Sequence, residues 1–310
     1  RGLEVAIYSW MRLIMRTRRL RLMALFAILA TVSVAAQTTV QRPWRGVIYT
    51  FDKRKNPAQE IHTVVVELGK VRVRSVPAGP DPDGPGKWQT ILMPTSKVAE
   101  REKFDIAING DFYVIPRGKE LESEEVMTLL AQGMPALATG PAMTDGKVWS
   151  TSEKARQCLV ADAKGRVSLV DARVSPAKAM QVICGRDFLV FNGKVQFTDE
   201  GVTYKPGEFR NINPRTAVGI DKRGKRLYIL VIDGRSELAK GMTYGQLAAE
   251  MVRMGAYTAI NLDGGGSSTL VIRDDKGELK VMNRPSDGKE RAVANVLGLT
   301  FKKNRTTPSR

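Results

Sequence analysis

Apolar runs separated by short polar turns follow one another along most of the chain, a pattern typical of β-strands. The run 61–68 is rich in β-branched residues and predicts a buried strand, whereas residues 71–76 alternate between apolar and polar positions, as in a half-exposed strand. The apolar runs at 104–108, 216–220 and 227–232 each lead directly into a polar residue. Polar side chains at the ends of buried strands are good candidates for a functional site.

The middle of the chain, residues 134–196, predicts a β-meander. Turn signals at 145–146, 164–165 and 192–193 are each flanked by apolar runs, as in β-hairpins. By contrast, residues 77–86 hold four prolines and three glycines, which predicts a loop.

One segment has the pattern of an amphipathic helix between two predicted strands. Thr243 and Gln246 have the spacing of a capping box. Leu247 and Met251 share one face, and Gly255 suits the position just after a helix end. The segment therefore predicts a strand–helix–strand unit.

These elements predict an α+β fold with a single catalytic domain over residues 37–301. We expect a mixed, mostly antiparallel β-sheet core with a few packed helices. The short polar tail at 302–310 is expected to be disordered.

The N-terminal region predicts export. Four arginines between residues 16 and 21 precede an apolar run at 22–30, and small residues follow up to Ala36. This is the organisation of a secretory signal peptide, which we expect over residues 1–36, with residues 1–10 as an over-extended start. The mature protein would then be periplasmic or extracellular with no stable membrane span. An uncleaved signal that anchors the protein in the inner membrane is the alternative.

The chain is strongly basic, with 49 Lys+Arg against 32 Asp+Glu and a formal net charge of +17. Such a charge suits nucleic acid, an anionic envelope polymer or a phosphate-rich substrate. The sequence has no zinc-finger spacing, RNA-binding aromatic motif or long basic stripe, so we expect no nucleic-acid partner.

Several familiar chemistries are excluded by counting residues. His62 is the one histidine, so a His-rich metal site is excluded, and a Ser-His-Asp triad would depend on that residue. The segment 265–269 departs from the G-x-S-x-G nucleophile motif because position 269 is threonine. The G-x-x-x-x-G-K-[ST] motif is absent, and no G-x-G-x-x-G follows a predicted strand.

Cys158 and Cys184 are the two cysteines, and both lie in strand-like segments. Export to an oxidising compartment would permit a disulfide between them, and two buried thiols are the alternative. The geometry that decides between these states is not set by the sequence.

The most distinctive segment is Asp263, which ends a predicted strand and is followed by three glycines and two serines at 264–268. Three glycines remove three side chains from one patch, so a ligand can approach backbone N–H groups, and successive N–H groups bind anions. Arg215 and Asp233 lie at the ends of other predicted strands. An arginine can hold a phosphate, and two carboxylates can divide acid and base work.

The order and spacing of six short motifs resemble those of the phosphodiester glycosidase family. The motifs are N-G-D-F-Y at 109–113, N-P-R-T-A-V-G at 213–219, I-D-G-R at 232–235, G-M-T at 241–243 before the helix, N-L-D-G-G-G-S-S at 261–268 and N-R-P-S-D-G at 283–288. The resemblance covers residues 45–301. The family that the chain resembles includes bacterial exported proteins linked to exopolysaccharide.

This resemblance implies an exported hydrolase that cleaves a sugar-1-phosphodiester of envelope or extracellular glycans and so releases the sugar from the phosphate. The residues that it places in the cleft are Asn109, Gly110, Arg215, Asp233, Asp263, Gly264, Gly265, Gly266 and Ser267, with Arg291 at the edge. Asn213 stands where histidine is common in the family, a difference that bears on substrate preference.

We assign roles to these residues as hypotheses. Asp233 and Asp263 are the expected acid, base or nucleophile. Arg215 and the amides of the glycine turn are expected to bind the phosphate. Asn109 and Ser267 are expected to orient the sugar.

Two alternatives remain open at this stage. The first is a non-catalytic binding module for anionic envelope polysaccharide. The second is a metal-dependent phosphodiesterase that uses Mg²⁺ or Ca²⁺ held by aspartates. The sequence itself requires no cofactor, and it leaves the oligomeric state undetermined.

Overall fold

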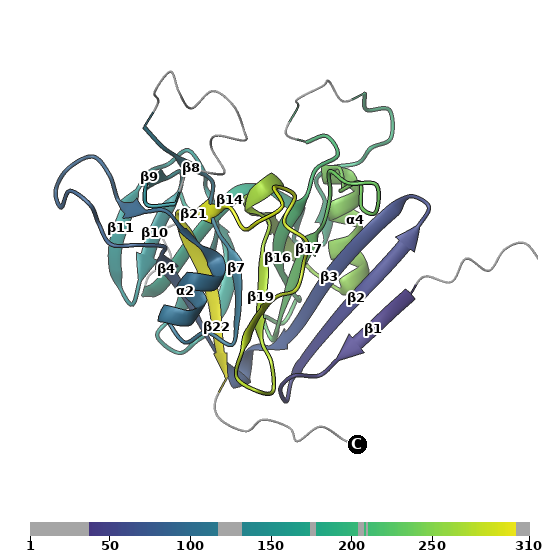
Figure 1. The fold of residues 1–310 in the computed structure, drawn as a ribbon, viewed down its shortest axis with the longest axis horizontal. Coiled ribbons are helices and arrows are strands. Elements are labelled where there is room, and N and C mark those ends of the chain that lie inside the picture. The colour runs from purple at the N-terminus through teal and green to yellow at the C-terminus, as the bar shows by residue number, and fades with distance from the viewer. Residues whose placement is uncertain (1–36, 117–131, 174–177, 204–207, 209, 302–310) are drawn as a thin grey trace, which may run out of the picture. The chain divides into compact units, whose positions relative to one another are not determined.

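Antiparallel sheets make up most of the computed structural model, which describes residues 37–116, 132–173, 178–203, 208 and 210–301 (Figure 1). The larger sheet has twelve strands, in the order β1 (Gln37–Gln41), β2 (Val47–Lys55), β3 (Ala58–Glu67), β17 (Arg226–Ile232), β16 (Arg215–Ile220), β18 (Thr258–Asn261), β14 (Ala179–Phe191), β10 (Pro141–Thr144) and β11 (Lys147–Thr151), with β12 (Gln157–Asp162), β13 (Val167–Asp171) and β15 (Lys194–Val195) attached on the β14 side.

The second sheet has five strands, in the order β20 (Leu279–Val281), β19 (Leu270–Arg273), β7 (Ile106–Asn109), β22 (Asn295–Phe301) and β4 (Val71–Pro77). Two small sheets complete the strands: β21 (Ala292–Val293) with β6 (Met93–Pro94), and β5 (Thr90–Ile91), β9 (Pro135–Ala138) and β8 (Tyr113–Val114).

Every described strand pair is antiparallel. The predicted antiparallel core is therefore confirmed, but the parallel pairing implied by a mixed sheet does not occur among these strands. The reason is the position of β16. The strands β17 and β18 run in the same direction, yet β16 lies between them and pairs with both.

Two α-helices are present in the described part of the chain, together with the 3₁₀ segments η1 (Leu68–Lys70) and η3 (Gly265–Ser267). The helix α4 (Tyr244–Met254) confirms the predicted one: Thr243 and Gln246 form a capping box, and Gly255 ends the helix with φ +100°. The short helix α2 (Thr95–Arg101) was not predicted.

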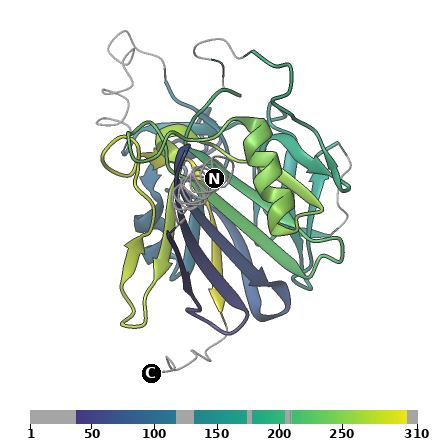
Figure 2. The ribbon, with the colours of Figure 1, turned by 90° about the vertical axis from the view of Figure 1, so that its right-hand side faces the viewer.

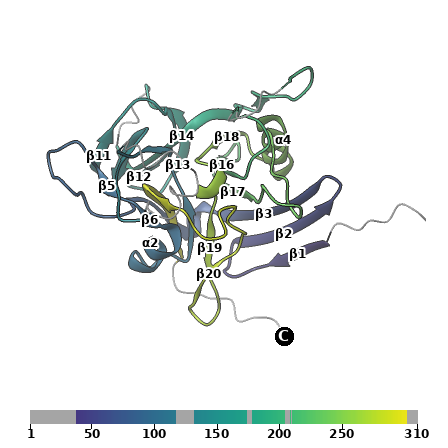
Figure 3. The same ribbon diagram turned by 45° about the horizontal axis from the view of Figure 1, so that its top comes forward.

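The main hydrophobic core lies between the two large sheets, where Ile229 of one and Ile106 of the other belong to the same cluster. Leu247 of α4 packs with Leu230 in a separate cluster. The helix α4 lies along one face of the larger sheet (Figure 2). Val98 of α2 packs on the smaller sheet. The two helices consequently cover different sides of the strands (Figure 3). This packing fixes the strand ends on which a site can be built.

The predicted β-meander is confirmed by hairpins at each of the three turn signals: β10 with β11, β12 with β13, and β14 with β15. Cys158 of β12 lies opposite Cys184 of β14 in the strand register, and the two are joined by a disulfide.

The described residues belong to one compact unit that begins at Gln37. The predicted signal peptide at 1–36 and the tail at 302–310 lie outside them. Within the described residues, neither helix has the length and apolar character needed to cross a membrane.

Candidate active site

The ends of several strands meet at one edge of the larger sheet. Because β16 is antiparallel to both β17 and β18, its first residue, Arg215, lies beside the positions where those strands end. Asp233 follows β17, and Asp263 comes two residues after β18. The smaller sheet joins the site through Asp263, whose N–H donates to the carbonyl of Gly110 at 3.0 Å, just after β7.

A cavity of about 410 Å³ opens at this edge. It is lined by three arginines and two acidic residues, so its charge is net positive, and its volume suits a sugar phosphate. The lining residues are Phe112, Glu208, Asn211, Ile212, Asn213, Arg215, Arg235, Asp263, Gly264, Gly265 and Arg291. The cavity thus brings together Arg215, Asp263, Gly264, Gly265 and Arg291 of the predicted site, but its lining does not include Asn109, Gly110, Asp233, Gly266 or Ser267.

Asp263 is a cavity-lining carboxyl with a raised pKa. Burial raises the pKa of Asp263 to about 6, and nearby Ser267 and Arg291 offset part of that rise. The N–H of Gly264 donates to Oδ1 of Asp263 at 3.0 Å and helps to fix its orientation. A carboxyl group with a pKa close to neutrality is suited to proton transfer or to nucleophilic attack.

Asn109 does not contact the cavity and instead ties four segments together. Its side chain is fully buried, and its Nδ2 donates to the carbonyl of Asp263 at 2.7 Å. Its Oδ1 accepts from Thr216 Oγ1 at 2.8 Å and from Thr269 N at 3.1 Å. The lining of the cavity does not include Asn109, so its predicted contact with the sugar has no support in this arrangement. Its side chain is used to hold the segment that carries Asp263.

Gly110 has a packing role as well, and its predicted contact with substrate stays a prediction because the cavity lining does not include it. A Cβ at this position would lie 2.2 Å from Oδ1 of Asn295 and 2.4 Å from Cδ1 of Ile183. The space is filled by the protein itself. Glycine is needed here so that β7 can approach both β22 and β14 closely.

Asp111 is a second buried carboxyl near Asp263. Burial raises the pKa of Asp111 to about 8, and the charge of Asp263 adds to the rise. Its Oδ2 accepts from Gly140 N at 2.6 Å, and its Oδ1 accepts from Thr139 Oγ1 at 3.1 Å. Two carboxyls with separated pKa values lie in one region, as in many acid–base sites.

The amides of the glycine turn are mostly committed to protein acceptors. Gly264 N donates to Asp263, and Gly265 N donates to the carbonyl of Pro214 at 3.0 Å. The N–H groups of Ser267 and Ser268 donate back to carbonyls within the turn. Four donors, the N–H groups of Gly264, Gly265, Ser267 and Ser268, are therefore bonded within the protein, and phosphate binding by the amides of the turn stays a prediction. The turn has the left-handed φ of +59° at Gly265, and this backbone conformation favours glycine.

Gly266 makes room for an ion pair. Arg291 is bound to Asp287 by Nε at 2.8 Å and by Nη2 at 2.7 Å, and this pair lies against Gly266. A Cβ on Gly266 would lie 2.0 Å from Oδ2 of Asp287 and 2.4 Å from Nη2 of Arg291. The glycine therefore allows Asp287 to hold Arg291 at the cavity wall, where the sequence predicted that arginine.

Arg215 is held rigidly in the cavity wall. Its Nε donates to the carbonyl of Met242 at 2.9 Å, and its Nη2 donates to the carbonyl of Asn211. The guanidinium also lies 4.7 Å from the centre of the Tyr244 ring. These contacts make Arg215 a fixed positive charge in the wall of the cavity that Asp263 also lines.

Asp233 belongs to a different network, behind the cavity. The N–H of Arg284 donates to both of its carboxylate oxygens at 3.0 Å, and Asn283 Nδ2 donates to Oδ1 at 3.2 Å. Its Oδ2 lies 3.5 Å from Nε2 of His62, whose Nδ1 is 2.9 Å from the hydroxyl of Tyr49. The side chain is buried and outside the cavity lining, so the structure does not support the predicted pairing of Asp233 with Asp263.

Ser267 is fully buried. It lies close enough to Asp263 to lower the pKa of that carboxyl. The predicted direct contact with the sugar is not supported because Ser267 is absent from the cavity lining. The described residues also contain no group of three or more His, Cys, Asp or Glu side chains placed to hold a metal ion.

The sequence analysis missed several residues of the site: Asp111, Phe112, Arg235 and Asp287. All four lie inside the recognised motifs, so the signal was present. Strand ends alone do not show which member of a motif faces a cavity. Phe112 and Arg235 line it. Asp111 is close enough to Asp263 for their charges to interact, and Asp287 forms an ion pair with Arg291.

Comparisons with known proteins show the family and the fold of this chain. A family model described as phosphodiester glycosidase matches residues 102–300. The N-acetylglucosamine-1-phosphodiester alpha-N-acetylglucosaminidase of Bos taurus is 33% identical over 102 residues, which make up 30% of this chain and 19% of the bovine protein. The match therefore spans about a fifth of that relative.

Two solved structures share the fold. The catalytic domain of the zebrafish N-acetylglucosamine-1-phosphodiester alpha-N-acetylglucosaminidase, auto-inhibited by its pro-peptide, has a TM-score of 0.58 and 23% identity over 88% of this chain and 91% of its own. A hypothetical protein from Synechocystis has a TM-score of 0.61 and 13% identity over 87% of this chain and 64% of its own.

Proposed function

This chain belongs to the phosphodiester glycosidase family, and from that premise we propose that it hydrolyses sugar-1-phosphodiesters in the cavity beside Asp263. The observation that carries the proposal is the placement of one carboxyl with a pKa of about 6 among three arginines in the lining of one cavity. A phosphodiester carries a negative charge next to an electrophilic sugar carbon. The cavity offers a positive surface for the former and a carboxylate for the latter.

The chemistry follows from these charges. In the proposed reaction, ionised Asp263 either removes a proton from a water that attacks the anomeric carbon, or attacks that carbon itself and forms a glycosyl ester that water then hydrolyses. The bond between the anomeric carbon and the bridging oxygen breaks, and its electron pair stays on the phosphate. Since the leaving group is already an anion, the reaction relies less on a general acid than on positive charge that stabilises the departing phosphate.

The three cavity arginines, Arg215, Arg235 and Arg291, supply that positive charge. Arg215 is fixed by two carbonyls and Arg291 by Asp287, so neither has to reorganise as the leaving group departs. Preorganised charge of this kind is a large contribution to catalysis in many enzymes.

The experiment that tests the proposal is hydrolysis of a panel of sugar-1-phosphodiesters in H₂¹⁸O, followed by mass spectrometry. Attack at the sugar places ¹⁸O in the released sugar, and attack at phosphorus places it in the phosphate. We expect the label in the sugar and no product from the Asp263→Asn variant.

The other outcomes identify the competing functions. Label in the phosphate, with activity lost on addition of a chelator, would indicate a metal-dependent phosphodiesterase. Saturable binding of anionic polysaccharide without any product would indicate a binding module. Either result would overturn the proposed reaction.

We also propose that the reaction takes place outside the cytoplasm, on envelope or extracellular glycans. The support is the signal-peptide pattern of residues 1–36 and the disulfide between Cys158 and Cys184, which suits an oxidising compartment. Fractionation of cells that produce the full chain tests this location, and a purely cytoplasmic protein would contradict it.

A further inference from the structure

A second cavity, of about 640 Å³, lies between the loop that follows β4 and the β10–β11 hairpin. It shares no lining residue with the cavity at Asp263. Two tryptophans, Trp88 and Trp149, lie in its wall. Lys87, which precedes Trp88 in the chain, and Lys147, two residues before Trp149, also line the cavity. The proposed hydrolysis uses none of these residues.

The loop that forms one wall is held in shape by its own aspartates. Oδ1 of Asp81 accepts from the N–H groups of Asp83 and Gly84 at 3.1 and 2.9 Å. The carboxylate of Asp83 accepts from Lys87 N at 2.8 Å and from Trp88 N at 3.1 Å. The segment that the sequence predicted only as a loop is therefore an ordered wall, and its acidic groups are turned to its own backbone.

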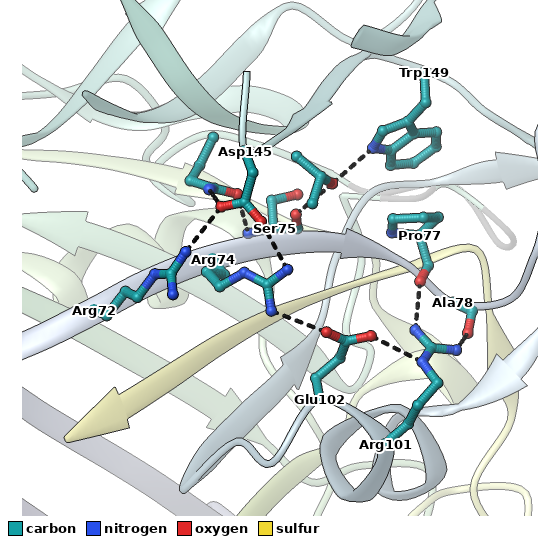
Figure 4. Close-up of polar contacts among 11 residues, drawn as sticks. Arg72, Arg74, Ser75, Pro77, Ala78, Arg101, Glu102, Asp145 and Trp149 are labelled. Carbon is teal, nitrogen blue, oxygen red and sulfur yellow. Dashed lines mark hydrogen bonds and ion pairs between the residues drawn. The ribbon is translucent and has the colours of Figure 1, made fainter. Parts of the chain in front are cut away.

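Trp149 is fixed on the opposite wall. Its Nε1 donates to Thr144 Oγ1 at 3.1 Å, and Thr144 donates to the carbonyl of Ser75 at 2.6 Å (Figure 4). Below the cavity, Arg101 donates to the carbonyl of Pro77 at 3.0 Å. An indole that is partly exposed and held by its N–H presents an apolar surface at little cost in conformational entropy.

The charge of the cavity is basic. Lys87 and Lys147 are exposed, and Nζ of Lys87 lies 4.7 Å from the centre of the Trp88 ring. Gln89 and Thr151 add polar groups to the lining. A pyranose ring has an apolar C–H face and hydroxyls at its edge, which match a fixed aromatic surface surrounded by polar groups. The cationic groups match an acidic substituent on such a ring.

From this arrangement we propose that the cavity between Trp88 and Trp149 is a binding site for an acidic oligosaccharide, separate from the catalytic cavity. A sugar ring stacks on the indole of Trp149, and the lysines bind its anionic groups. The site would hold a glycan chain on the protein whether or not that chain is cleaved, so the proposal does not depend on the proposed reaction.

The test is isothermal titration of the purified protein with hexagalacturonate, and with maltohexaose as a neutral counterpart of equal length. Hexagalacturonate contains no phosphodiester, so failure of this test is independent of the proposed hydrolysis. We expect hexagalacturonate to bind at least about 10-fold more tightly than maltohexaose, a difference that ion pairing at a partly exposed site can supply.

Three variants locate the binding. We expect Trp149→Ala to weaken hexagalacturonate binding by about 10-fold or more and Trp149→Phe, which keeps an aromatic ring, by about 3-fold. Lys87→Ala/Lys147→Ala should weaken it by about 10-fold. The charge-matched control, Lys164→Ala/Lys276→Ala, removes two exposed lysines elsewhere and should leave binding unchanged.

Thermal unfolding of each variant shows whether the fold persists. If Trp149→Ala fails to fold, Trp149→Phe and the lysine pair still decide the question. The proposal is overturned if the wild-type protein does not bind hexagalacturonate, if maltohexaose binds equally well, or if the control pair weakens binding as much as Lys87→Ala/Lys147→Ala.

Discussion

Asp263 and Asp233 have the same local sequence, an aspartate followed by glycine after a buried apolar strand, yet the fold gives them different surroundings. Asp263 lines a cavity with three arginines, and burial raises its pKa to about 6. Asp233 is buried outside that cavity and accepts hydrogen bonds from Asn283 and from the backbone of Arg284.

The difference comes from what covers each strand end. The loop that contains Asn283 and Arg284 closes over Asp233, and the same loop continues to Asp287 and Arg291 at the cavity. Asp233 therefore anchors one end of the segment whose other end supplies a cavity arginine. Asp263 is therefore available to a substrate, whereas Asp233 holds the cavity wall in place, although the two have the same local sequence.

The largest effect is expected from Asp263→Asn. Asparagine keeps an oxygen for the N–H of Gly264 but removes the base or nucleophile, so kcat/KM for a sugar-1-phosphodiester should fall by about 10³-fold or more. The measurement is release of sugar at pH 8.

Stability separates this effect from unfolding. When the pKa of a carboxyl is raised in the folded state, the free energy of unfolding of the protein falls as the pH rises through that pKa. At pH 8 the ionised Asp263 therefore lowers the stability of the folded protein. Asp263→Asn should consequently have an equal or higher Tm than the wild type. Retained turnover in the folded variant would rule out Asp263 as the reacting carboxyl.

Gly266→Ala tests whether Arg291 has to be held in position. The new methyl group would displace the side chains of Asp287 and Arg291, which can move without a shift of the backbone. We expect kcat/KM to fall by about 10²-fold while the fold persists, because a cavity arginine leaves its place beside the phosphate.

Gly69→Ala is the matched control, since a Cβ there meets no atom within 4 Å. Its activity should equal that of the wild type. Equal activity of Gly266→Ala would show that Arg291 does not contribute to turnover.

Asp233→Asn is expected to act on stability instead of chemistry. The new Nδ2 would face the N–H of Arg284 in either orientation, and in the place of Oδ1 it would face Asn283 Nδ2 as well, so at least one of the three buried hydrogen bonds is lost. The free energy of unfolding should fall by about 2 kcal/mol. Urea denaturation measures this loss, and kcat/KM at a temperature where the variant is folded should change by less than about 3-fold. A large loss of kcat with unchanged stability would instead support the predicted catalytic role of Asp233.

The contrast also marks what the sequence could predict. Local patterns were sufficient for the hairpins of the meander, for the capping box of α4 and for the motifs that surround the site. They were not sufficient for roles that depend on partners distant in the chain. Asn109 forms hydrogen bonds with Thr216, Asp263 and Thr269, which lie more than 100 residues away in the chain. These bonds use the Asn109 side chain to connect parts of the protein.

The glycine turn shows the same dependence on distant partners. Gly264 and Gly265 line the cavity, but the space next to the three glycines is also occupied by Pro214, Arg235 and the Asp287–Arg291 pair. No local rule gives the position of those groups. The carboxylate before the glycines, in contrast, does lie in the lining of the cavity, at the end of a buried strand as the local pattern indicates.

The last expected effect concerns the pH profile of kcat/KM, whose alkaline limb we assign to Asp111. The proposed active form has Asp263 ionised and Asp111 protonated, so kcat/KM should rise through about pH 6 and fall above about pH 8. Ionised Asp111 would place a second negative charge near Asp263 and the phosphate. At one pH unit above the second limb the loss should be about 10-fold.

Asp111→Asn removes the second titration and keeps the first, because Asp111 is already neutral at pH 6. The variant should keep the rise near pH 6 and lose the fall near pH 8. Its free energy of unfolding should also lack the component that the wild type loses between about pH 4 and pH 8, as the unfolded chain ionises Asp111 and the folded protein does not. If the fall near pH 8 survives in a stable Asp111→Asn protein, another group limits the reaction there, and Asp111, like Asp233, belongs to the framework around Asp263.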